Sequence, residues 1–120
     1  MKHLSDVLIK HGTLIKLSLD FSYGDNKITD AGAKHLSVGL ANCTALKSFK
    51  IDLSAGRNKI TDDGIKGLSN ALKNCKCLEF INLGFESDEN ILTNPSMHIL
   101  SEVIENCRTS LKELQINLEG

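Results

Sequence analysis

An eight-residue pattern occurs four times in this 120-residue chain and constrains its fold more than any other feature. The pattern reads L-x-x-φ-x-φ-x-φ, where φ is an apolar residue, and its copies cover residues 14–21, 46–53, 78–85 and 111–118. Successive copies start 32, 32 and 33 residues apart. The alternating apolar positions are typical of a strand with one buried face. A fixed period of this kind predicts a repeat protein, in which neighbouring units bury their apolar faces against each other.

An apolar stripe with helical spacing follows the strand pattern in each full unit. The stripe consists of Ala33, Leu36, Leu40 and Cys43 in the first full unit, and it contains Leu68, Leu72 and Cys75 in the second. The sequence therefore predicts units that alternate one strand with one helix. We expect helices over about 31–42, 63–74 and 95–106.

Polar residues mark the expected ends of these helices. Asp30, Asp62 and Asn94 occupy one repeat position before the stripes, so we expect them to be the helix N-caps. Pro95 follows Asn94, as is favoured at the first helical position. Near the other ends, we expect the left-handed backbone conformation at Asn42, Asn74 and Asn106.

The repeat positions divide the chain into a single α/β domain of about three and a half units. The full units are expected at 14–45, 46–77 and 78–110, between a helical part at 1–13 and a strand at 111–120. Repeat arrays usually shield their ends with atypical polar units, and neither end has such a unit. We therefore expect a segment of a larger array, or a very small array with frayed ends. Either would associate end to end with another copy of the chain.

Composition narrows the classes of partner. The chain has a net charge of −1, whereas binding to nucleic acid or to a membrane surface requires a basic field. No apolar run approaches the ~20 residues needed to cross a bilayer. The sequence therefore predicts a cytoplasmic protein that binds neither nucleic acid nor membrane.

Three of the four cysteines occupy one repeat position. Cys43, Cys75 and Cys107 are spaced by 32 residues. Packed helices lie ~8–10 Å apart, which exceeds the ~7 Å limit for the Cα atoms of a disulfide. We therefore expect buried free thiols. Cys77 forms a Cys-x-Cys pair with Cys75, but no histidine is near in sequence, which favours structural thiols over a metal site.

The phrase N-x-I-T-D-x-G-x-x-x-L occurs at residues 26–36 and 58–68, after the strand pattern. The strand pattern and this phrase together resemble the leucine-rich repeat, which reads L-x-x-L-x-L-x-x-N-x-L and is followed by a helix. The resemblance is greatest to its ribonuclease-inhibitor-like subfamily. The asparagine comes four residues later than in that family, and such extended units resemble repeats of protist proteins. The resemblance implies a right-handed solenoid with parallel strands on the concave side and helices on the convex side.

Residues between the buried strand positions are expected to face the hollow of such a solenoid. The candidates for partner binding are Lys16, Asp20, Lys50, Asp52, Phe80, Asn82, Glu113 and Gln115 on the strands, and Tyr23 and Arg57 on the inserted loops. Phe80 is apolar where its equivalents are polar, which is typical of a binding hot spot or of an ordinary exposed aromatic residue. Lys16 and Asp20 are expected to lie beside Lys50 and Asp52 as matching columns on adjacent strands. These four residues would either bind a charged partner or solvate the face.

The sequence contains no motif for phosphate binding, dinucleotide binding or zinc hydrolysis. It therefore predicts a non-catalytic scaffold without a cofactor, which binds a protein through the concave sheet face and the adjacent loops. The alternative is regulation of an enzyme, either as the repeat arm of a kinase or as a small-GTPase activator that uses Arg57.

Overall fold

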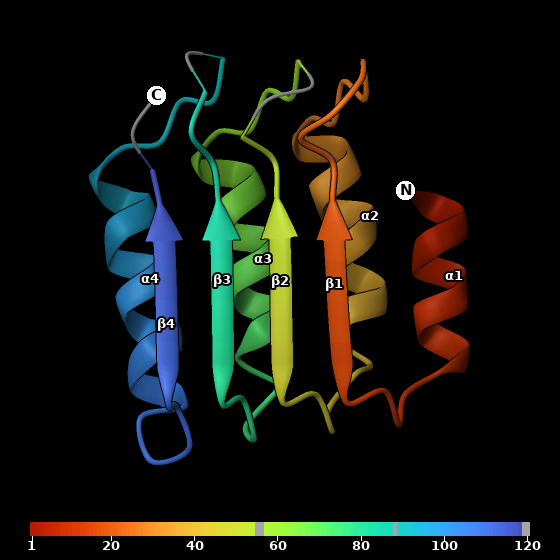
Figure 1. The fold of residues 1–120 in the computed structure, drawn as a ribbon, viewed down its shortest axis with the longest axis vertical. Helices are drawn as coiled ribbons and strands as arrows, with labels where there is room; N and C mark the ends of the chain where they lie inside the picture. Colours follow the sequence, from red (N-terminus) through yellow and green to blue (C-terminus); the bar gives the residue numbers. More distant parts are fainter. Residues whose placement is uncertain (55–56, 88, 119–120) are drawn as a thin grey trace.

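The computed structural model describes residues 1–54, 57–87 and 89–118 as a sheet layer and a helix layer (Figure 1). The sheet has four parallel strands in the order β1-β2-β3-β4, which confirms the predicted α/β class. In chain order the elements are α1 (Lys2–Lys10), β1 (Lys16–Asp20), α2 (Asp30–Leu40), β2 (Ser48–Asp52), α3 (Asp62–Leu72), β3 (Phe80–Gly84), α4 (Asn94–Asn106) and β4 (Glu113–Asn117). Figure 1 shows the helices behind the sheet, so the other sheet face is open.

The strand register reproduces the repeat period found in the sequence. Lys16 pairs with Ser48, Ser48 with Phe80, and Phe80 with Glu113. Equal positions of successive units therefore lie side by side on neighbouring strands. Because side chains alternate along a strand, one set of positions points to the helices and the other to the open face.

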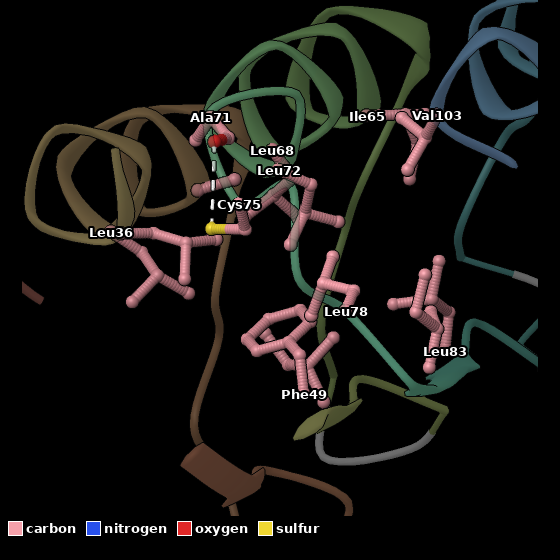
Figure 2. Packing of buried hydrophobic residues seen from close by; sticks show 14 of the residues in the cluster. Leu36, Phe49, Ile65, Leu68, Ala71, Leu72, Cys75, Leu78, Leu83 and Val103 are labelled. Carbon is pink, nitrogen blue, oxygen red and sulfur yellow. Dashed lines mark hydrogen bonds between the residues drawn. The ribbon is translucent and has the colours of Figure 1, made fainter. Parts of the chain in front are cut away.

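The core lies between the two layers, as Figure 2 shows. Its strand side includes Phe49 and Leu83, and its helix side includes Leu36, Leu68 and Leu72, all buried. The helical stripes predicted from the sequence are thus confirmed as core positions. Burial of such side chains typically stabilises a fold by ~1.5–3 kcal/mol each.

The outer strands bury their apolar residues less completely than predicted. Leu114 of β4 is 38% exposed, whereas Ile81, its neighbour on β3, is 2% exposed. Ile81 has Phe49 on one side and Leu114 on the other, but Leu114 has a neighbouring strand on one side only among the described residues. Leu17 and Leu19 of β1 are likewise only partly buried. The alternation pattern predicts which face a side chain occupies but not how many neighbours cover it.

Cys43, Cys75 and Cys107 are free and buried, as predicted, whereas Cys77 is exposed. The Cys75 thiol donates to the carbonyl oxygens of Cys43 at 3.2 Å and of Ala71 at 3.9 Å, the latter drawn in Figure 2. Burial disfavours the thiolate and raises the pKa of Cys75 to about 12. This thiol therefore remains protonated at pH values where an ordinary thiol has ionised.

We expect thiol-specific alkylation of the native protein to modify Cys77 rapidly and Cys75 slowly. The measurement is the extent of iodoacetamide labelling at each cysteine by peptide mass spectrometry. The labelling is done at pH 9.0, which equals the ordinary pKa of a thiol. After denaturation the two rates should converge, because the buried thiol then ionises like the exposed one. Equal native rates at the two cysteines would contradict the burial of Cys75.

The helix N-caps differ from the prediction by one residue. Thr29, Thr61 and Thr93 are the N-caps, and Asp30, Asp62 and Asn94 are the first helical residues. The Asp30 carboxylate instead accepts hydrogen bonds from the next unit, from the Thr61 N–H at 2.9 Å and from the Thr61 hydroxyl. A threonine and an aspartate are both good caps, and here the aspartate carboxylate bonds the next unit while the threonine takes the cap position.

Asp62 makes the same link to the following unit. Its carboxylate accepts from the Thr93 N–H at 2.8 Å and from the Thr93 and Ser96 hydroxyls. These hydrogen bonds, first that from Ser96 and then those from Thr93, lower the pKa of Asp62. Gly64 is at the same repeat position as Ser96, and an added Cβ there would lie 2.4 Å from the Asp30 Oδ1 atom. A glycine or a hydroxyl donor at this position therefore accommodates the aspartate of the preceding unit.

The asparagines at the helix C-terminal ends also have a different role from the one predicted. Among the described residues other than glycine, only Lys27 and Arg57 have positive φ angles, so these asparagines are not left-handed. Their side-chain amides donate to carbonyl oxygens of the preceding helix end. The bonds join Asn42 to Ile9 at 2.7 Å, Asn74 to Ala41 at 3.4 Å and Asn106 to Lys73 at 2.9 Å. Asparagine is therefore used here to connect units.

A second set of asparagines holds the loops between strand and helix. The Asn58 Oδ1 atom accepts from the Ile28 N–H at 2.9 Å, and its Nδ2 atom donates to the Phe21 carbonyl at 3.0 Å. Asn90 makes the equivalent bonds one unit later. Asn26 instead donates to carbonyls of its own loop.

Candidate functional site

The open face of the sheet presents three rows of side chains across the four strands. The first row is Lys16, Ser48, Phe80 and Glu113, the second is Ser18, Lys50, Asn82 and Gln115, and the third is Asp20, Asp52, Gly84 and Asn117. Neighbouring strands are ~4.8 Å apart, so side chains in one row can contact each other or a common ligand.

The first two rows line a hollow of about 460 Å³. Six of the ten predicted binding residues lie in it, namely Lys16, Lys50, Phe80, Asn82, Glu113 and Gln115. Ser18 and Ser48 complete the polar lining. The hollow therefore combines residues from all four strands. Lys16 and Glu113, at its two sides, are more than 90 residues apart in sequence.

Phe80 gives the hollow its apolar part. Its side chain is on the open face and 41% exposed, whereas the adjacent Ile81 is buried. Beside it, the Asn82 Nδ2 atom donates to the Gln115 Oε1 atom at 3.3 Å. An accessible aromatic residue with polar neighbours has the composition of a binding hot spot.

The charged residues of the hollow are separated by sign. Lys16 and Lys50 lie on β1 and β2, and Glu113 lies on β4. None of the three makes an ion pair with another residue in the part of the chain that the structure describes. Just outside the hollow, Lys112 and Glu79 do pair, at 2.7 Å. The charges inside it are thus available to a ligand.

Asp20 and Asp52 lie outside this hollow, in the third row. Their carboxylates accept hydrogen bonds from the N–H groups of Ser22 and Ser54, both at 2.9 Å. The hydrogen bonds from Ser22 lower the pKa of Asp20, with a smaller contribution from Lys50. The two aspartates are therefore occupied at the ends of their own strands. Gly84 leaves room for Asp52, because an added Cβ there would lie only 3.0 Å from the Asp52 Oδ1 atom.

The predicted side-by-side arrangement of the charged residues is only half right. Asp20 pairs with Asp52, but Lys16 pairs with Ser48 and Lys50 pairs with Ser18. The lysines therefore occupy different rows, because they lie at different positions of their repeat units.

Tyr23 and Arg57, the loop candidates, do not join the sheet-face hollow. Tyr23 is 83% exposed, and its carbonyl accepts from Asn26 at 2.6 Å. The Arg57 Nε atom lies 3.8 Å from the Asp25 carboxylate. Arg57 lines a different hollow of about 540 Å³ together with Lys27, Thr29, Lys59 and Glu89. Lys27 and Lys59 were not among the predicted residues, although both follow the asparagine of the N-K-I-T-D phrase.

Other kinds of site have no support in the described residues. No group of three or more histidine, cysteine, aspartate or glutamate side chains there could hold a metal ion. Within the same residues, none of the helices has the length and apolar character required to span a membrane. No family model matches the chain, and no curated protein matches its sequence.

Proposed function

We propose that this chain is a leucine-rich-repeat solenoid of the ribonuclease-inhibitor-like type that binds a segment of another protein on the open face of its sheet. The observation that carries this proposal is the hollow around Phe80, in which an accessible aromatic side chain is surrounded by two amides and by charged residues that make no ion pair with other described residues. Backbone pairing fixes the four strands relative to each other, so the lining residues are preorganised for binding.

The connections between strands support the solenoid. In Figure 1, β2 lies to the left of β1 and α2 passes behind the sheet, which is the arrangement of a right-handed crossover. The hydrogen bonds of Asp30, Asp62 and the asparagines recur at equal positions of successive units. Repeated contacts between nearest neighbours are typical of solenoid proteins.

The alternative, an enzyme regulator that acts through Arg57, has less support. A catalytic arginine supplied to a GTPase must reach the developing charge on the phosphate. Here the guanidinium lies 3.8 Å from the Asp25 carboxylate, on the loops and away from the sheet-face hollow.

Phe80→Ala tests the proposed function. The wild-type chain and the variant are immobilised, and proteins captured from an extract of the source cells are quantified by mass spectrometry. We expect the specifically captured proteins to fall about thirtyfold with Phe80→Ala, as for loss of a hot spot worth ~2 kcal/mol. Val38→Ala is the matched control, because Val38 is 62% exposed on α2. Equal losses with both variants, or none with Phe80→Ala, would contradict binding on the sheet face.

A further inference from the structure

We propose that the sheet-face hollow takes a peptide segment that crosses the strands and carries an acidic, an apolar and a basic side chain, in that order from β1 to β4. This inference rests on the proposed function and specifies the partner that it would bind. It follows from the positions of Lys16, Lys50, Phe80 and Glu113 in the first two rows.

The positive part of the hollow would hold the acidic side chain. Lys16 and Lys50 lie on adjacent strands in adjacent rows, so their ammonium groups can approach one carboxylate from two sides. Both side chains are exposed and make no ion pair with other described residues. A carboxylate between β1 and β2 would therefore gain two charge-assisted hydrogen bonds without breaking an ion pair of either lysine.

The spacing of the strands sets the spacing along the peptide. A point midway between β1 and β2 is ~7 Å from β3, given strands ~4.8 Å apart. Two residues of an extended chain span ~6.6–6.8 Å with their side chains on the same side. The acidic and apolar side chains are therefore expected two residues apart, with the apolar one against Phe80.

Glu113 sets the third position. It pairs with Phe80 in the register of β3 and β4, on the side opposite the lysines. A lysine or arginine two residues beyond the apolar position can reach its carboxylate, because these side chains are long and flexible. The recognised pattern is thus acidic-x-apolar-x-basic, read in one chain direction or the other. Complementary charges of this kind mainly determine which partner is accepted and how it is oriented.

The test uses a library of random seven-residue peptides displayed on phage, selected against the immobilised full chain and sequenced. We expect enriched peptides to carry the acidic-x-apolar-x-basic pattern in one direction and to lose binding to Phe80→Ala. Peptides that depend on Phe80 but show no charge pattern, or two like charges, would overturn this inference and leave the proposed function standing. If no peptide is enriched, or the enriched peptides bind Phe80→Ala equally well, both proposals fail.

Charge-reversal variants then assign the pattern to residues. A synthetic peptide of the enriched sequence is titrated by fluorescence anisotropy against the wild type, Lys16→Glu/Lys50→Glu and Glu113→Lys. Because the double variant places like charges beside the acidic residue of the peptide, it should weaken binding about tenfold or more. A peptide with its acidic residue replaced by lysine should recover that loss. Lys34→Glu on α2 makes one of these charge reversals outside the hollow and should have no effect. Equal weakening by Lys34→Glu, or no rescue by the lysine peptide, would overturn the assignment.

Discussion

Ile81→Ala is expected to lower the free energy of unfolding by about 2–5 kcal/mol, the range for truncating a large aliphatic side chain in a core. Ile81 is 2% exposed and lies between Phe49 and Leu114 on the neighbouring strands. Removal of its side chain leaves a cavity that the adjacent strands cannot fill, because their backbone pairing fixes their spacing. The measurement is urea unfolding followed by circular dichroism.

Phe80→Ala is the matched control for this prediction. Phe80 precedes Ile81 on β3 but faces the open side of the sheet, so we expect a loss of about 1 kcal/mol or less. The two substitutions thus distinguish the two faces of one strand. If Phe80→Ala destabilised the protein more than Ile81→Ala, the register of β3 would be shifted by one residue.

Asn58→Ala is expected to destabilise the protein by about 2–4 kcal/mol, because it removes two hydrogen bonds between units and leaves the Ile28 N–H without its Asn58 partner. Asn58 is fully buried, at 0% exposure. Its side chain accepts from the Ile28 N–H and donates to the Phe21 carbonyl, and both of these residues belong to the preceding unit. Alanine can make neither bond, and only the Phe21 carbonyl keeps another donor, the Asn26 amide. Thermal and urea unfolding of the variant would measure the loss.

Asn26→Ala provides the comparison at the same repeat position. Asn26 is exposed, and its amide bonds only to carbonyls of its own loop, at Phe21 and Tyr23. Water can replace those bonds, so we expect a loss of about 1 kcal/mol or less. Equal losses at the two positions would show that the bond between units adds nothing to stability.

The strand register could be predicted from the sequence because parallel strands of equal units align equal positions. Phe80 and Ile81 were accordingly assigned to opposite faces, and the structure confirms this assignment. The helix caps could not be predicted in the same way. Thr29 and Asp30 are both good helix caps, and the sequence pattern does not show that the Asp30 carboxylate bonds a threonine N–H 31 residues away.

The residues of the sheet-face hollow could be predicted for the same reason, since strand alternation fixes the direction of each side chain. The loop residues follow no such rule. Arg57 has a φ angle of 57°, and its placement depends on this local backbone conformation rather than on the repeat pattern. Asp20 and Asp52 point to the open face, but the serines two residues later determine their hydrogen bonds.

The bonds between units also determine how such a chain can lengthen. At each junction that the structure describes, an asparagine donates to the preceding helix end, and the asparagines recur 32 residues apart at Asn42, Asn74 and Asn106. A second copy of residues 46–77 inserted after position 77 would meet compatible partners on both sides. The insertion would widen the open face by one strand, ~4.8 Å. Duplication of one unit in the gene would therefore enlarge the open sheet face and keep the asparagine bonds that join successive units.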